Sequence, residues 1–146
     1  MILHTKKSSD FANIAVALLD IIENFQSDNA TVVALTGELG AGKTTLTQYL
    51  AKALGIEETI QSPTFVIMKH YPLQTTHYKL LTHLDAYRIE KVEEMQVLGL
   101  HKLIADPKNL ILIEWPENIS ELLPDKRIDV KIEYDGEGRR VEISND

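Results

Sequence analysis

Apolar and polar positions in the first part of the chain predict a helix followed by a buried strand. Residues 11–25 carry apolar side chains at helical spacing, behind a capping residue that is either Ser9 or Asp10. Residues 31–36 hold an uninterrupted apolar run. A continuous run, as opposed to an alternating one, is typical of a parallel strand that is buried on both faces. This part of the chain therefore indicates a sheet covered by helices.

Further helices and strands follow in the middle of the chain. Residues 44–54 predict a helix that ends at Gly55, and residues 90–98 predict a shorter helix that ends at Gly99. Strands are expected over three apolar segments, at residues 64–68, 78–84 and 110–113.

The last part of the chain has a different periodicity. Apolar and polar residues alternate over 128–134, and the alternation resumes over 141–143 after a turn at Asp135-Gly136. An antiparallel hairpin with one buried face has this pattern. We therefore predict an α/β fold with a central, mostly parallel sheet and helices on both of its faces. Antiparallel strands, including this hairpin, are expected to extend the sheet.

Length, composition and charge limit the class of protein. The chain has 146 residues, of which 44% are hydrophobic, so residues 1–146 are expected to form a single domain. It has no cysteine, which excludes disulfides, thiolate metal sites and cysteine nucleophiles. The sequence suggests neither a membrane segment nor a secretory signal, so a cytoplasmic location is expected. The net charge of −7 argues against an extensive nucleic-acid surface.

The strongest chemical signal is a glycine-rich loop between the strand at 31–36 and the helix at 44–54. Residues 37–44 match the pattern G-x-x-x-x-G-K-[ST] in the context that a phosphate-binding P-loop requires. Glycines let backbone N–H groups point at phosphate oxygens, and the start of the helix adds a partial positive charge. In such a loop Lys43 contacts the β- and γ-phosphates and Thr44 contacts Mg²⁺. A glycine-rich turn with a surface lysine, the alternative, does not account for the flanking strand and helix.

Two acidic residues at the ends of predicted strands are candidates for the metal site. Glu114 directly follows the apolar strand 110–113, as in a Walker B strand, and Asp85 ends the strand that begins at Tyr78. Carboxylates in these positions reach the edge of a parallel sheet where phosphates bind. Each is also compatible with an ordinary capping or loop carboxylate, and the sequence leaves that alternative open.

Thr64 and Trp115 are weaker candidates. In Ser62-Pro63-Thr64-Phe65, the proline favours an extended turn that would direct the Thr64 hydroxyl toward the metal and the γ-phosphate. The same segment is compatible with a simple proline turn before a strand. Trp115, the single tryptophan, either stacks on a base or packs in the core.

The scarcity of arginine separates the possible activities. The chain has Arg88, Arg127, Arg139 and Arg140 as its only arginines, and it shows neither the arginine-bearing lid of small-molecule kinases nor an [NT]-K-x-D guanine motif. ATP hydrolysis or ATP-gated binding is thus favoured over phosphoryl transfer to a metabolite. Because a missing arginine finger costs about 10³–10⁵ in rate, slow hydrolysis is expected of the isolated chain. A P-loop kinase of a small metabolite or nucleoside, and an ATP-dependent conformational switch with incidental hydrolysis, remain alternatives.

With these residues in place, the chain resembles the TsaE family (YjeE in older usage), small bacterial ATPases needed to make threonylcarbamoyladenosine on tRNA. A P-loop alone is generic, whereas several family segments in the family's order are specific. The matching segments are G-x-x-G-A-G-K-T-T at 37–45, S-P-T-[FY] at 62–65, H-x-D-x-Y-R at 83–88, an acidic helix ending in L-G at 93–99, and I-E-W-x-E at 113–117.

The resemblance implies a P-loop NTPase fold, the cofactors ATP and Mg²⁺, and a role for each matched residue. Lys43, Asp85 and Glu114 are the implied catalytic residues, with Glu114 acting on the catalytic water or the metal. Trp115 is the implied adenine contact. The metal candidates are Thr44, Asp85, Glu114 and, from its proline turn, Thr64. The nucleotide-binding candidates are Glu38, Leu39, Gly40, Ala41, Gly42, Lys43, Thr44, Thr45 and Trp115.

The resemblance also implies protein partners. They are TsaD, the transferase that acts on the tRNA adenosine, and TsaB, its dimerising companion. The chain is then expected to hydrolyse ATP for this complex and to meet tRNA only indirectly, which agrees with its acidic charge. No membrane partner is expected.

Overall fold

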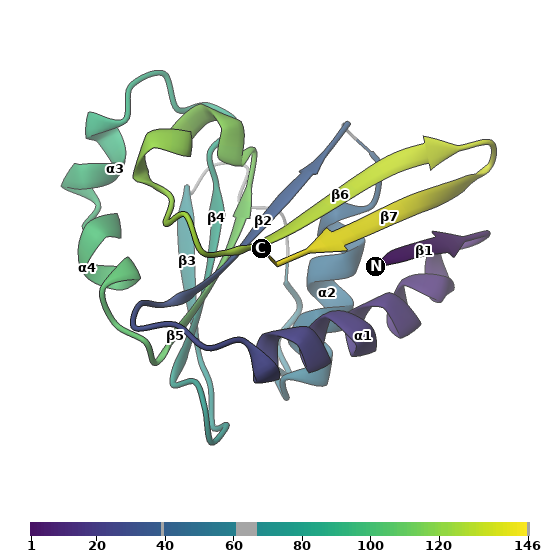
Figure 1. Ribbon diagram of the computed structural model, residues 1–146, viewed down its shortest axis with the longest axis horizontal. Helices are drawn as coiled ribbons and strands as arrows, with labels where there is room; N and C mark the ends of the chain where they lie inside the picture. Colours follow the sequence, from purple (N-terminus) through teal and green to yellow (C-terminus); the bar gives the residue numbers. More distant parts are fainter. Residues whose placement is uncertain (39, 61–66, 146) are drawn as a thin grey trace.

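One sheet organises the fold, and the computed structural model describes residues 1–38, 40–60 and 67–145 of the chain (Figure 1). In spatial order, the strands of the described residues are β1 (Ile2–Thr5), β7 (Gly138–Ser144), β6 (Ile128–Asp135), β2 (Thr31–Gly37), β5 (Asn109–Glu114), β4 (Leu80–Asp85) and β3 (Met68–Pro72). The helical segments are η1 (Ser8–Asp10), α1 (Phe11–Asn24), α2 (Lys43–Ala53), α3 (Glu93–Val97), α4 (Leu100–Ile104) and η2 (Pro116–Leu122).

The centre of the sheet is parallel. β2 pairs with β5 on one side and with β6 on the other, and β4 pairs with β5, all in the parallel sense. β1, β7 and β3 are antiparallel to their neighbours and extend the sheet at its two edges. The predicted fold class is confirmed, and the first strand of the C-terminal hairpin proves to belong to the parallel part.

Helices cover both faces of the sheet (Figure 1). α1 and α2 enclose an apolar core with Val33 and Leu35 of β2, whereas α3, α4 and η2 enclose a second core with Val32. Successive side chains of a strand point to opposite faces, so a strand between two cores needs apolar residues at every position. The continuous apolar run of β2 has this cause.

α1 and α2 begin and end within about one residue of the predicted bounds, as such boundaries usually do. The Asp10 side chain does not cap α1 itself. Its carboxylate accepts hydrogen bonds from the N–H groups of Lys6 and Lys7, at 2.8 and 3.1 Å. It therefore closes the η1 turn that leads into α1. The apolar face of α1 is buried as predicted, through Phe11, Ile14, Ala15, Leu18 and Ile22.

The strands of the second half of the sheet differ in part from the prediction. The strand expected at 64–68 overlaps β3 only at Met68, and β3 continues to Pro72; residues 64–66 lie outside the described part of the chain. The strand expected at 78–84 is β4, which begins and ends later. β1 has no counterpart in the prediction, because a short edge strand is stabilised by pairing with distant β7 and carries little pattern of its own.

The helix expected at 90–98 is also shorter in the structure. α3 spans Glu93–Val97, and the chain turns at Gly99 with a φ of 79° before a second short helix, α4, begins. The sequence predicts Gly99 as the end of a helix, and in the structure this left-handed residue also begins the next helix.

None of the helices in the described ranges combines the length and the apolar character that crossing a membrane would take.

Candidate nucleotide-binding site

The glycine-rich loop lies between the end of β2 and the start of α2, and neighbouring elements press against it. A Cβ atom on Gly37 would lie 2.7 Å from the carbonyl oxygen of Ile132 in β6. Gly42 has a φ of 118°, and a Cβ there would lie 2.6 Å from Cζ of Phe11 in α1. Only glycine fits at Gly42, because L-residues with side chains rarely adopt this backbone conformation and the space is already filled. The loop is thus shaped by β6 and α1.

The start of α2 offers backbone donors that have no acceptor within the helix. The Leu46 N–H donates to the Gly42 carbonyl at 2.9 Å and makes the first α-helical bond. The N–H groups of residues 43–45 therefore have no acceptor within the helix. Together with the positive end of the helix dipole, such groups form an anion-binding site.

Lys43 begins α2 and is almost fully buried, with 6% of its surface exposed. Its Nζ donates to the Gly37 carbonyl at 2.6 Å and lies 4.1 Å from the centroid of the Trp115 ring. Burial lowers the pKa of Lys43, while the charges of nearby carboxylates, Glu114 foremost, act in the opposite direction. The Lys43 amine is thus held at the loop by the Gly37 carbonyl and the Trp115 ring, and it is close enough to Glu114 and Asp85 to feel their negative charge.

The two strand-end acids are neighbours in the sheet. Asp85 and Glu114 are register partners at the carboxyl ends of parallel β4 and β5. They share a sheet face with Leu81 and Leu112, which belong to the core under α1 and α2. The acids therefore face the side of the sheet on which the P-loop helix lies, and sequence reasoning placed both at the correct edge.

Glu114 is the more deeply buried of the two. Only 3% of the residue is exposed, and its Oε2 lies 2.7 Å from Nε2 of His83 on the adjacent strand. His83 is fully buried. The pattern along the chain does not predict this contact, because it depends on the register between β4 and β5.

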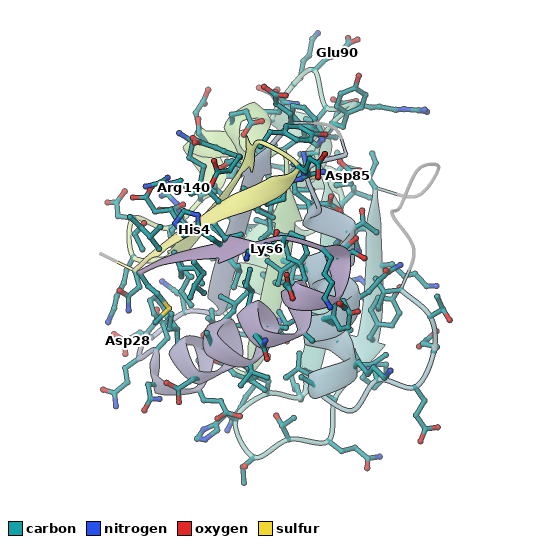
Figure 2. All side chains as sticks on the ribbon, turned by 90° about the vertical axis from the view of Figure 1, so that its right-hand side faces the viewer. His4, Lys6, Asp28, Asp85, Glu90 and Arg140 are labelled. Atoms are coloured by element: carbon teal, nitrogen blue, oxygen red, sulfur yellow. The ribbon has the colours of Figure 1, made fainter. Side chains whose placement is uncertain are left out.

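Asp85 lies at the end of the molecule that carries Glu90, away from Asp28 (Figure 2). Its Oδ1 accepts a hydrogen bond from the Tyr87 N–H at 3.0 Å. Burial raises the pKa of Asp85 above its ordinary 3.8, and the charge of Glu114 raises it further, although the Tyr87 N–H opposes both. A half-buried carboxylate next to a second carboxylate favours a cation as a neighbour.

Trp115 adopts an unusual backbone conformation. It is the one non-glycine residue with a positive φ in the described part of the chain, at 58°, and it precedes Pro116. For a bulky residue this conformation costs about 1–3 kcal/mol and is most often found at functional sites. The turn brings the Trp115 ring against the Lys43 amine and to 5.0 Å from the Tyr87 ring.

The position of Trp115 bears on its expected role. Since Lys43 is the residue that reaches β- and γ-phosphates in a P-loop, a ring 4.1 Å from its Nζ lies near the phosphate end of the site. Contact with the adenine stays a prediction. The sequence left open whether Trp115 packs in the core or stacks on a base. In the structure, the side chain packs partly against the second apolar core, and its ring also contacts Lys43.

The C-terminal hairpin contributes a residue that sequence reasoning missed. Arg139 of β7 donates from Nε to the carbonyl of Ala41 in the loop at 3.0 Å, and its guanidinium lies 4.1 Å from the centroid of the Tyr134 ring. No local signal could have revealed this contact, because it exists only when β6 pairs with β2. Arg88, the arginine of the H-x-D-x-Y-R segment, is exposed.

The donor set fits Mg²⁺. Thr44, Asp85 and Glu114 all offer oxygen, the ligand type that Mg²⁺ prefers, and Mg²⁺ usually takes only one or two carboxylates besides phosphates and waters. The described residues contain no group of three or more His, Cys, Asp or Glu side chains that could hold a metal alone. The remaining candidates Thr64 and Leu39 lie outside the described residues.

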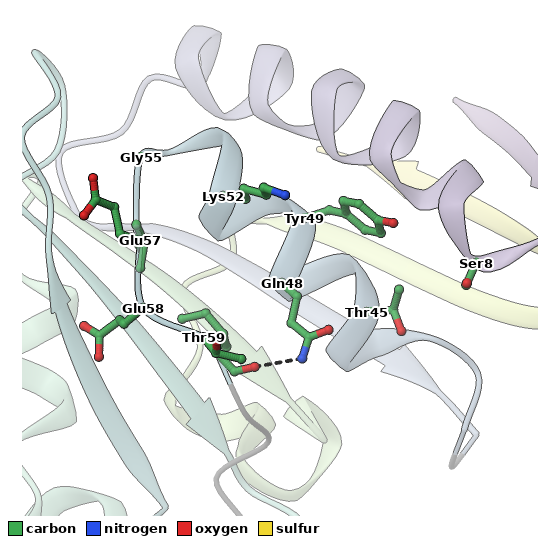
Figure 3. Close-up of a pocket in the computed structure, with 11 residues that line it drawn as sticks. Ser8, Thr45, Gln48, Tyr49, Lys52, Gly55, Glu57, Glu58 and Thr59 are labelled. Atoms are coloured by element: carbon green, nitrogen blue, oxygen red, sulfur yellow. Dashed lines mark hydrogen bonds between the residues drawn. The ribbon is translucent and has the colours of Figure 1, made fainter.

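A groove of about 870 Å³ runs along α2 beside the loop (Figure 3). It begins at Thr45, next to the P-loop, and continues past Gln48, Tyr49 and Lys52. Gln48 forms part of its wall by donating to the carbonyl of Ile60 at 2.8 Å. The groove therefore gives the start of α2 open space on its outer side.

The sequence matches known proteins over most of its length. A family model described as threonylcarbamoyl adenosine biosynthesis protein TsaE matches residues 5–141. A Haemophilus influenzae protein named tRNA threonylcarbamoyladenosine biosynthesis protein TsaE is 32% identical, over 85% of this chain and 76% of its own length. A Bacillus subtilis protein of the same name is 39% identical, over 75% of this chain and 65% of its own length.

The fold matches as well. The crystal structure of Bacillus subtilis YdiB superimposes with a TM-score of 0.72 and 28% sequence identity, over 99% of this chain and 84% of that one. The loop, the paired strand-end acids and the central parallel strands thus occur in a chain that the TsaE family model matches from residue 5 to residue 141. This chain belongs to the TsaE family.

Proposed function

We propose that the chain binds Mg·ATP at the P-loop and hydrolyses it in support of threonylcarbamoyladenosine biosynthesis on tRNA. The observation that carries this proposal is the convergence of Lys43, Asp85 and Glu114 at the carboxyl edge of the sheet, directly beside the free N–H groups of α2. The names of the relatives support the pathway. The geometry of the site supports the chemistry.

Each residue of the site has a distinct task in this proposal. The N–H groups of residues 43–45 bind phosphate oxygens, and the Lys43 amine exchanges the Gly37 carbonyl for the β- and γ-phosphates. Thr44 and Asp85 would hold Mg²⁺. When bound, the ion supplies positive charge that offsets the charge of the phosphates. Glu114 orients and activates the attacking water, for which a buried carboxylate beside the phosphates is suited.

Phosphate release from Mg·ATP tests the proposal. We expect Glu114→Gln to lower kcat by about 10²–10⁴-fold, the usual contribution of a general base, while ATP still binds. Glu121→Gln, which changes an exposed glutamate of η2, is the matched control and should behave as the wild type. Normal hydrolysis by Glu114→Gln would mean that this carboxylate has been assigned the wrong role.

We further propose that TsaB and TsaD are the partners of the chain and accelerate its hydrolysis. Among the described residues, Arg127 and Arg140 pair with Asp129 and Glu142, and Arg139 is engaged by a backbone carbonyl and an aromatic ring. Arg88 is exposed, so the arginines of the free chain are paired, engaged or at the surface, and a γ-phosphate would need an additional positive group. A group supplied by a partner would fill that role. Equal rates of phosphate release with and without the TsaB–TsaD pair would contradict this part of the proposal.

A further inference from the structure

We propose that His83 is a positioning residue that holds the Glu114 carboxylate in the orientation that hydrolysis requires. This inference rests on the proposed function, because it assumes that Glu114 acts on the attacking water. His83 itself is fully buried and lies behind Glu114, on the strand that pairs with β5. It therefore acts through the carboxylate.

The hydrogen bond between the two side chains is short and shielded from water. The distance from His83 Nε2 to Glu114 Oε2 is 2.7 Å, and 0% and 4% of the two side chains are exposed. A carboxylate can only accept, so the Nε2–H of the imidazole donates. A charge-assisted bond of this length in a buried setting restricts the rotation of the carboxylate. One oxygen is fixed, and Oε1 is left for the reaction.

Packing alone does not explain a histidine at this position. The second ring nitrogen, Nδ1, is buried and has no hydrogen-bond partner among the described residues. A buried ring nitrogen without a partner destabilises the fold relative to an apolar side chain. Thr82, the preceding residue, is equally buried but satisfies its hydroxyl with Nδ1 of His70 at 2.9 Å. The hydrogen bond to Glu114 is therefore the interaction that accounts for a histidine at position 83.

Substitutions of His83 can test whether its N–H donor must lie at the position of Nε2. His83→Gln carries an amide N–H near the position of Nε2, whereas His83→Asn carries the same amide one carbon shorter and cannot reach Glu114. His83→Leu removes the donor altogether. A positioning role therefore predicts that the glutamine variant retains hydrolysis and that the other two variants lose it.

The experiment measures kcat for phosphate release and the Kd of Mg·ATP in the full chain. We expect His83→Leu and His83→Asn to lower kcat by about 10–100-fold, the usual effect of removing a residue that orients a functional ligand, with Kd unchanged. His83→Gln should stay close to the wild type. Thr82→Val, which deletes a buried hydroxyl on the opposite face of β4, is the control for loss of a buried polar group and should keep the wild-type kcat.

A double variant separates positioning from general support of the fold. If His83 acts only through Glu114, then His83→Leu combined with Glu114→Gln should hydrolyse ATP no more slowly than Glu114→Gln alone. A purely structural role would instead add a further loss. If the leucine variant fails to fold, as a thermal melt would reveal, the asparagine and glutamine variants carry the same comparison.

The outcomes distinguish this inference from the proposal beneath it. Normal hydrolysis by His83→Leu or His83→Asn, together with a slow Glu114→Gln, would overturn the role of His83 and leave Glu114 in place. Equal losses in the glutamine and asparagine variants would overturn it too. Normal hydrolysis by Glu114→Gln would contradict the proposed function itself.

Discussion

At the scale of single residues, the site keeps charged groups where burial disfavours them. Burial lowers the pKa of Lys43 and raises the pKa of Asp85, so both charged forms are disfavoured by desolvation. Trp115 adds a strained backbone conformation at the same place. Groups that reduce the stability of the free protein are expected where a ligand will later compensate for them.

One prediction follows for Asp85 in the absence of nucleotide and Mg²⁺. Because the folded state raises the pKa of Asp85 above 3.8, the charged carboxylate reduces stability at neutral pH. Asp85→Asn removes this charge and keeps an acceptor for the Tyr87 N–H, so the variant should melt a few degrees higher than the wild type. Thermal melts at neutral pH measure this difference.

The pH dependence of the melting temperature tests the sign of the Asp85 effect a second time. As pH falls through the raised pKa of Asp85, the wild-type carboxyl becomes neutral and regains the lost stability, so the gap between variant and wild type should close. Asp28→Asn, which changes an exposed aspartate at the opposite end of the molecule, should melt like the wild type at neutral pH (Figure 2). An Asp85→Asn protein that melts lower than the wild type at neutral pH would refute this account of the burial.

At the scale of elements, the loop takes its shape from three parts of the chain that are distant in sequence. Phe11 of α1 fills the space beside Gly42, Ile132 of β6 lies against Gly37, and Arg139 of β7 binds the carbonyl of Ala41. Phosphate-binding loops need their backbone N–H groups to be set before the ligand arrives. The helix α1 and the β6–β7 hairpin therefore support the sheet and also prepare the site.

Gly42→Ala should change the backbone shape of the phosphate-binding loop. The added methyl group would have to occupy a position 2.6 Å from the Phe11 ring on a backbone with a φ of 118°, so the loop must move. We expect Mg·ATP binding to weaken about tenfold or more, a loss of roughly 1.4 kcal/mol. Equilibrium binding of the variant measures this effect.

Gly55→Ala provides the matched control. Gly55 also has a positive φ, at 88°, but a Cβ there would meet no atom of the described residues within 4 Å. This variant carries the backbone strain without the clash, so it should lose some stability and keep its affinity for nucleotide. If both variants bind Mg·ATP like the wild type, the loop does not depend on Phe11.

At the scale of the whole molecule, the order of residues along the chain predicts where the candidate residues lie in the sheet, but it does not predict the contacts around them. The P-loop and Glu114 were predictable because strand, loop and helix, or strand and acid, are adjacent in sequence. The bond between His83 and Glu114, the contact of Arg139 with Ala41, and the pairing of β1 with β7 all join distant segments. Their partners are set by sheet order and register, which periodicity alone does not determine.

The charge of the molecule agrees with the proposed indirect contact with tRNA. One sheet with its two cores accounts for the described chain, and the net charge of −7 does not favour tRNA as a direct ligand. The proposed division of labour therefore assigns ATP to this chain and tRNA to its partners.

The central claim is that nucleotide binds at the P-loop through Lys43, and a calorimetric titration with Mg·ATP tests it most directly. The account predicts one site per wild-type chain and binding about tenfold or more weaker in Lys43→Ala, with Lys52→Ala, at the far end of α2, as an unaffected control. Equal affinity of the wild type and Lys43→Ala would contradict the account.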